Sequence, residues 1–365
     1  MKTRLALGAG LVAVALCLPM LTRAAPADPL EAQAAGVARW IDGNAAAEVV
    51  ATGSPLFDQE WTFGAWQMAA LGFLQHAEQN PASRAADLAR VDACLTHLFS
   101  PAGRAFDRAE WGADPLDTLG EDRGHAAWLG YTNLVLSSRR RLDPKGPWAA
   151  ENDALTAAIV RRLDVALLPE TYPGQRFPVD VSAMVASVGV HARATGQPEP
   201  PVLARWRKAL RERWLVDGIL VQAVDADGRA TDAPRGSGTF LAAWFLSSWD
   251  AALAADLTRS AAARLRVETG PLVAMREYPP GHEGRGDIDS GPIVGGLGVS
   301  STGFAIGAAR AAGELELARG LERTATLVGA PATTDGELHW RTGAALGSPA
   351  LADAILFAMM STPTR

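Results

Sequence analysis

The sequence predicts an all-α fold in which six helical hairpins close into a ring, with apolar helices inside and charged helices outside. Three observations lead to this prediction. Charged and apolar segments alternate six times along the 365 residues. Loops from a charged segment to the next apolar one are long, whereas the return connections are short. The apolar segments carry too little charge to face water on any side, so neighbouring helices have to cover them.

The charged segments are expected to be amphipathic outer helices. The first mixes Glu31, Arg39, Asp42 and Glu48 with alanines, which is typical of a helix with one face toward water. The last is similarly rich in Glu and Arg. In chain order these segments are 30–50, 83–99, 150–168, 201–216, 252–267 and 314–328.

The apolar segments are expected to be inner helices. The first has no ionised residue at neutral pH apart from the possible charge of His76, and the second is nearly free of charge. The fifth follows directly on a polar loop, 277–290, and this abrupt change marks a place where a fold can hold reactive groups at the mouth of a cavity. In chain order these segments are 61–77, 124–138, 180–194, 237–250, 291–309 and 348–360.

The loop lengths give the arrangement of the hairpins. Because the loops that lead into the apolar segments are about ten to twenty-four residues long, all the long loops lie on one rim. The inner helices then run parallel, with their N-termini at that rim. The alternative is an open solenoid of helix pairs, which usually has short, regular connectors and a recurring consensus. The sequence has neither, so a closed ring is favoured.

The N-terminus resembles a secretory signal peptide. Lys2 and Arg4 precede an apolar run at 5–21, and Ala24 ends a plausible cleavage site. An uncleaved anchor is the alternative, but this run is at the short end of the roughly 17–25 residues that span a bilayer. We therefore expect a signal peptide at 1–24, a single domain at 25–365, a periplasmic or secreted protein, and no stable membrane insertion after cleavage.

Composition narrows the possible partners. Removal of Lys2, Arg4 and Arg23 reduces the 34 basic residues to 31, against 40 acidic residues, so the mature chain has a net charge of −9. No basic block is present, and nucleic acid is not expected as a partner. Cys94 is the only cysteine beyond the signal peptide, which excludes an internal disulfide and a cysteine-based metal cluster. No cofactor and no metal site are expected.

Six alternating outer and inner helices with long loops on one rim resemble the six-hairpin (α/α)6 toroid superfamily, which includes many carbohydrate-active hydrolases and lyases. The resemblance covers essentially the whole mature chain and concerns architecture, so it implies the fold more than the activity. The segment 170–196, ETYPGQRFPVDVSAMVASVGVHARATG, is also similar to the linalool dehydratase/isomerase-like branch of this fold. That resemblance implies cysteines in this region, and the segment has none, so no catalytic residue is carried over.

The loops that enter the inner helices are the expected location of a binding site. Helix N-termini that converge on one rim favour anionic groups, because each carries a partial positive charge and free N–H groups. The candidates for substrate binding are Glu60, Trp61, Arg123, Tyr172, Asp180, Arg235, Tyr278, His282, Trp340 and Arg341. For any single acid the alternative is helix N-capping, which we expect for Asp180 and Asp289.

The candidates for catalysis are Asp287, Asp289, Glu121, Asp122 and His125. Residues i and i+2 of an extended stretch point the same way, so Asp287 and Asp289 could both face a cavity. One carboxylate raises the pKa of its neighbour, which gives the acid and base pair that sugar hydrolysis or elimination needs. The alternative is a cap at Asp289 and an ion pair from Asp287 to Arg285. Glu121, Asp122 and His125 could supply the partner group from across the ring.

Three hypotheses follow for function. The first is an exported carbohydrate-active enzyme, a glycoside hydrolase or polysaccharide lyase acting on a small-molecule or oligosaccharide substrate, with Arg123, Arg235 and Arg341 available to bind a uronic carboxylate. The second is a non-catalytic toroid that binds a glycan or a protein through the same rim. The third, implied by the second resemblance, is a lyase or isomerase acting on a small apolar alcohol.

Overall fold

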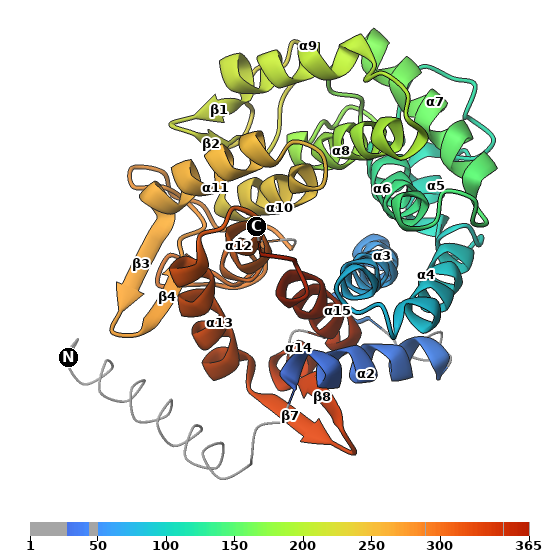
Figure 1. Ribbon diagram of the computed structural model, residues 1–365. Coiled ribbons are helices and arrows are strands. Elements are labelled where there is room, and N and C mark those ends of the chain that lie inside the picture. Colours follow the sequence, from blue (N-terminus) through green and yellow to red (C-terminus); the bar gives the residue numbers. More distant parts are fainter. Residues whose placement is uncertain (1–27, 44–49, 289, 346, 365) are drawn as a thin grey trace.

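Two concentric rings of helices make up the fold (Figure 1). The computed structural model describes residues 28–43, 50–288, 290–345 and 347–364, so the expected signal peptide lies outside the described residues. Within them, the inner ring consists of α3 (Pro55–Gln79), α6 (Ala126–Leu142), α8 (Pro178–Thr195), α10 (Gly236–Ser247), α12 (Val299–Ala311) and α15 (Pro349–Met360). The outer ring consists of α2 (Pro29–Asp42), α4 (Arg84–Leu98), α7 (Ala149–Val165), α9 (Pro201–Ala209), α11 (Ala251–Leu265) and α13 (Leu315–Gly329).

The inner ring is closed. Each inner helix contacts the next one along the chain, and the last, α15, packs against the first, α3. The predicted (α/α)6 toroid is therefore confirmed, and the open solenoid is excluded.

Burial follows the charge pattern of the sequence. In α8 every residue from Pro178 to Ala192 is buried, because this helix has neighbours on all sides. In α13, by contrast, the buried residues are Leu317, Ala318, Gly320, Leu321 and Gly329, which leaves the rest of the helix toward water. The apolar side chains of the two rings join in one large core that includes residues from every inner helix. Hydrophobic burial of the inner ring is thus the main force that holds the toroid together.

Several predicted boundaries are wrong. The first inner helix, expected at 61–77, already begins at Pro55. The first helix, expected at 30–50, ends at Asp42 with Gly43 as its C-cap, and 44–49 lie outside the described residues. The fourth outer segment, expected at 201–216, is α9 followed by a π-helical turn, η3 (Leu210–Trp214). Inside the long loop after α4 there is a short helix, α5 (Ala105–Trp111).

A further error concerns the segment 291–309, whose first part is not helical. Residues 293–298 form a small hairpin of β5 (Ile293–Val294) and β6 (Leu297–Gly298), and α12 begins only at Val299. Gly295 and Gly296 make the turn with φ of 61° and 83°, values that an L side chain rarely adopts. Pro292, directly before the hairpin, lacks the N–H that a helix needs. The backbone preferences of proline and glycine, and not the absence of charge, therefore determine the structure of residues 291–298.

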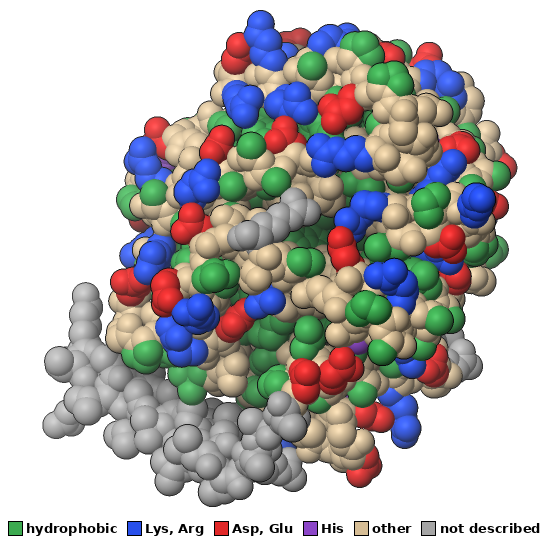
Figure 2. All heavy atoms as spheres, viewed as in Figure 1, with side chains coloured by type: hydrophobic (Ala, Val, Ile, Leu, Met, Phe, Trp, Pro, Cys, Tyr) green, Lys and Arg blue, Asp and Glu red, His purple; other side chains and the backbone are tan. Residues whose placement is uncertain are grey.

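Short antiparallel hairpins extend the loops of the toroid. Besides β5 and β6 they are β1 (Leu215–Val216) with β2 (Ile219–Leu220), β3 (Arg266–Thr269) with β4 (Leu272–Met275), and β7 (Pro331–Thr334) with β8 (Glu337–Trp340). A short helix, α14 (Arg341–Ala345), follows β8. Among the described helices none is long and apolar enough to span a bilayer. Figure 2 shows basic and acidic side chains interspersed over the described part of one face.

Two glycines of α12 provide a test of the inner packing. A Cβ at Gly307 would lie 2.8 Å from Trp244 Cδ1 and 2.6 Å from Met359 Sδ, whereas a Cβ at Gly303 would meet no atom within 4 Å. Gly307→Ala is therefore expected to lower the free energy of unfolding by about 1–3 kcal/mol. Gly303→Ala, in the same helix, is expected to be neutral or to stabilise by up to about 1 kcal/mol. Urea unfolding measures both, and equal stabilities would contradict the close packing of α12.

Candidate active site

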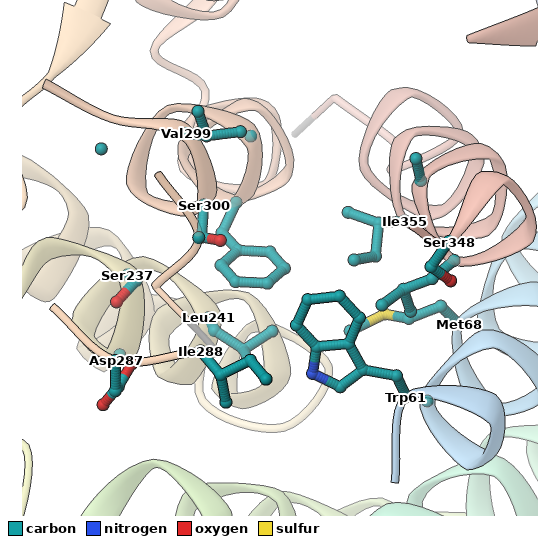
Figure 3. A pocket seen from close by; sticks show the side chains of 18 of the residues that line it. Trp61, Met68, Ser237, Leu241, Asp287, Ile288, Val299, Ser300, Ser348 and Ile355 are labelled. Atoms are coloured by element: carbon teal, nitrogen blue, oxygen red, sulfur yellow. The ribbon is translucent and has the colours of Figure 1, made fainter. Parts of the chain in front are cut away.

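A cavity of about 1160 Å³ opens among the N-terminal parts of the inner helices. All six contribute to its lining, for example through Trp61 of α3, Tyr131 of α6, Asp180 of α8, Leu241 of α10 and Ile355 of α15. Figure 3 shows Trp61, Leu241, Ile288, Val299 and Ile355 around this space. The long-loop rim predicted from the sequence is thus the mouth of a real cavity.

Acids and uncharged groups line the cavity. Four carboxylates belong to the lining: Glu60, Glu110, Asp180 and Asp287. No Lys, Arg or His is among the lining residues that the structure describes. Most of the remaining lining side chains are aliphatic or aromatic. The described residues also contain no group of three His, Cys, Asp or Glu side chains placed to hold a metal ion.

Asp180 is the buried acid of the cavity. It is the third residue of α8 and is 8% exposed. Tyr131 Oη donates a hydrogen bond to Asp180 Oδ1 at 2.5 Å, and Thr171 Oγ1 donates to Oδ2 at 2.6 Å. Burial raises the pKa of the Asp180 carboxyl, and the two hydroxyl donors only partly oppose this shift. The expected cap at Asp180 is not formed, because Phe177 is the N-cap residue of α8 and no side chain caps the helix.

The tight contact between α6 and α8 brings the partners of Asp180 together. A Cβ at Gly130 would lie 2.7 Å from Met184 Cγ and 3.2 Å from the Asp180 carbonyl, so only glycine permits this approach. The residue after it, Tyr131, then reaches across to the Asp180 carboxyl. From the other side, Trp111 Nε1 of α5 donates to the Thr171 carbonyl at 3.0 Å and holds that loop in place. The helix α5, which has no clear pattern in the sequence, thus supports the acid.

Asp287 lines the cavity but is already paired. Arg235, which is 6% exposed, donates hydrogen bonds from its guanidinium to Asp287 and to Asp232. Asp287 Oδ1 also accepts from the Ser290 N–H at 2.9 Å. In Figure 3 its carboxylate points away from the apolar centre of the cavity. The alternative ion pair with Arg285 is replaced by this pair with Arg235, and Asp289 lies outside the described residues.

The other proposed catalytic residues lie away from the lining. Glu121, Asp122 and Arg123 are exposed; Arg123 Nε is 3.7 Å from Glu121 Oε2, and Asp122 Oδ1 is 3.7 Å from Arg161 Nε. His125 is buried outside the cavity lining, and its Nδ1 lies 2.5 Å from Asp107 Oδ2. It holds a left-handed backbone conformation, with φ of 62°, at the start of α6. The structure therefore does not bring these residues together with Asp287.

The candidates for substrate binding divide into two groups. Glu60, Trp61, Tyr172 and Trp340 line the cavity together with Asp180. Tyr278 lies outside the lining, with its ring 5.6 Å below the guanidinium of Arg235. His282 and Arg341 are exposed and do not belong to the lining.

Glu277 is a buried acid that the sequence analysis did not select. It is fully buried directly behind the lining residue Ser237, whose Oγ donates to Glu277 Oε1 at 2.5 Å. Ser301 Oγ donates to the other carboxylate oxygen. Burial raises the pKa of the Glu277 carboxyl. No local pattern distinguishes this residue from the other acids of its loop, because its two serine partners come from different helices.

Solved structures share this fold, although no family model and no curated protein sequence matches the chain. One is the unsaturated glucuronyl hydrolase from Bacillus sp. GL1, described as responsible for the degradation of glycosaminoglycan. It is 11% identical, with a TM-score of 0.50 over 91% of this chain and 96% of that chain. Another is a variant of a protein described as a glycosidase, 14% identical, with a TM-score of 0.51 over 92% of this chain and 98% of that chain. At such identities the likeness shows the fold alone.

Proposed function

From the toroid fold that the chain shares with glycosidases, we propose that it is a carbohydrate-active enzyme that cleaves a glycosidic bond of an uncharged substrate, with Asp180 as the proton donor. One observation carries this proposal. Asp180 presents a buried carboxyl with a raised pKa to a large cavity at the mouth of the toroid. A carboxyl whose pKa is raised keeps its proton to higher pH and can give it to a leaving oxygen.

The partners of Asp180 suit a group that changes its protonation state. A hydroxyl both donates and accepts, so Tyr131 and Thr171 can donate to the ionised carboxylate and rotate to accept from the protonated acid. The carboxyl is therefore held in one orientation before and after proton transfer. Such fixed geometry is what general acid catalysis requires.

Glycoside cleavage also needs a second carboxylate. Of the other three in the lining, Asp287 points away from the apolar centre of the cavity, and Glu110 is exposed. Glu60 is partly buried in the first turns of α3. We assign Glu60 as the group that activates water or attacks the sugar.

The charges around the cavity favour a neutral substrate. A basic side chain is the strongest partner for the carboxylate of a uronic acid, and none of the described lining residues is basic. Arg235 is committed to two aspartates, and Arg123 and Arg341 do not belong to the lining. The proposed substrate thus differs in charge from the glucuronyl group named for the solved hydrolase.

The apolar lining favours a second candidate function, elimination or isomerisation on a small apolar alcohol with Asp180 as the acid. The cavity is larger than such a substrate needs, since pockets of about 300–1,000 Å³ already hold drug-sized ligands. The described free cysteine, Cys94, is buried in α4 and does not line the cavity. We therefore place this function second.

A substrate panel tests the proposal. Purified protein is incubated with neutral glycosides, with the same glycosides carrying a uronic acid, and with linalool, and products are measured by a reducing-end assay and gas chromatography. We expect sugar release from at least one neutral glycoside and none from its uronate counterpart. Release from the uronates alone would contradict the neutral substrate, and conversion of linalool alone would support the second candidate. Binding by calorimetry without any product would identify a non-catalytic toroid.

A further inference from the structure

We propose that the substrate is amphiphilic, with a neutral sugar at the Asp180 end of the cavity and an apolar aglycone at the end lined by α12, α13 and α15. This inference rests on the proposed function and names the substrate class of the same site. Three observations support it: the division of charge along the lining, the exposure of apolar side chains there, and the position of Trp61.

Charge is divided between two parts of the chain. All four lining carboxylates lie at or before Asp287, whereas every lining residue from 292 to 356 is uncharged. The side chains of this second part include Leu297, Val299, Phe304, Leu351, Ile355 and Leu356. Figure 1 shows α12, α13 and α15 side by side, across the ring from α6 and α8, which carry Tyr131 and Asp180. We call the part of the lining formed by α12, α13 and α15 the uncharged end; it lies across the ring from Asp180.

Apolar side chains at the uncharged end are exposed to solvent. Val294 is 69% exposed, Val328 58% and Val299 39%, and all three line the cavity. They are among the few large hydrophobic residues that are exposed in the described chain. A cluster of exposed apolar side chains around a concave site is typical of a surface that a ligand covers. A free monosaccharide presents too many hydroxyls to cover these valines favourably, whereas an alkyl or aryl aglycone suits them.

Trp61 lies in the middle of the lining residues that Figure 3 labels. In Figure 3 its indole projects into the space between Leu241 and Ile288 on one side and Ile355 on the other. An indole ring can stack on the apolar face of a pyranose and also contact a hydrocarbon chain. This position suits the junction between a sugar and its aglycone.

Binding of paired glycosides tests this inference independently of turnover. The Asp180→Asn variant, which is expected to bind without cleavage, is titrated by calorimetry with methyl and hexyl glycosides of glucose, galactose and mannose, and with hexanol. Each methylene that is fully buried should tighten binding about fourfold. For at least one sugar we expect the hexyl glycoside to bind about tenfold or more tightly than both the methyl glycoside and hexanol. Equal affinities of the methyl and hexyl glycosides for all three sugars, or equal affinities of hexyl glycoside and hexanol, would overturn the inference.

Two valine variants test where in the cavity the hexyl group binds. Val328, in the last turn of α13, lines the cavity, whereas Val165, at the end of α7, does not and is 67% exposed. Val328→Asn should reduce the preference for hexyl over methyl about threefold, and Val165→Asn should leave it unchanged. An unchanged preference in Val328→Asn would contradict the location. If the unmodified protein cleaves no glycoside but binds hexyl glycosides more tightly than methyl glycosides, the proposed reaction is wrong and the amphiphilic site is supported. If it cleaves glycosides but shows no preference for the hexyl group, the reaction is supported and the amphiphilic site is wrong.

Discussion

Asp180→Asn is expected to lower kcat by about 10²–10⁴-fold, the usual contribution of a positioned general acid. The amide has the same shape: its oxygen can accept from one of the two hydroxyls, Tyr131 or Thr171, and its NH2 can donate to the other, which rotates to accept. It has no acidic proton to give to a leaving oxygen. Initial rates on the best glycoside of the panel measure the loss. Substrate affinity should change little, so an effect confined to KM would contradict the assignment.

The pH dependence gives an independent check on Asp180. Its proton is required for catalysis, so kcat/KM should fall as pH rises through the raised pKa, and the Asn variant should lack this decline. The folded protein binds this proton more tightly than the unfolded chain, where an Asp has a pKa of about 3.9. The stabilising contribution of Asp180 is therefore fully present below that value and is lost as pH rises through the folded pKa. At neutral pH the Asn variant should be at least as stable as the parent, and a marked loss of stability would indicate a structural role.

Arg235→Met is expected to lower the free energy of unfolding by about 2–3 kcal/mol. Loss of one member of a fully buried ion pair costs about 3–5 kcal/mol. We expect less here because the side chains of Asp287 and Asp232 are 37% and 39% exposed. The variant also frees the loop that carries Ile288 into the cavity wall, so turnover should fall too. Urea unfolding and initial rates measure the two effects.

Arg229 offers a matched control for Arg235. It pairs with Asp227, and both side chains are more than two thirds exposed, so Arg229→Met should change stability by no more than about 0.5 kcal/mol. Arg235→Lys retains the charge but not the two-pronged geometry, and should give an intermediate loss. Equal stabilities of the Arg235→Met and Arg229→Met proteins would show that Arg235 does not anchor the loop.

The fold was predictable because each inner helix is marked along its whole length by the absence of charge. The segment 180–194 reads as buried, and α8 is buried from Pro178 to Ala192. Charge is also absent at 291–298, but Pro292 and the Gly295–Gly296 turn favour a hairpin there instead of a helix. The hydrophobic pattern of a sequence predicts which residues are buried, but it does not predict the backbone conformation of a glycine-rich stretch.

The position of the candidate site could be predicted from the sequence, but the ion pairing and the pKa of its acids could not. Acids at the entrances of the inner helices do reach the cavity, as Asp180 in the first turn of α8 and Asp287 in the loop before α12 show. Their chemistry depends on residues that are distant in sequence. Asp287 is paired with Arg235, 52 positions away, and the pKa of Asp180 depends on its burial beside Tyr131, 49 positions away. Spacing along the chain carries no signal for either contact.

Closure of the ring by α15 has a consequence for biosynthesis. Gln79 Nε2 at the end of the first inner helix donates to the Ser361 carbonyl at 2.6 Å, so the first and last inner helices are joined at this seam. A ribosome releases Asp180 and its hydroxyl partners long before Leu351 and Ile355, which form part of the cavity wall. The nascent chain therefore carries its acid while the binding site is still open on one side. Substrate can be enclosed only after α15 has emerged.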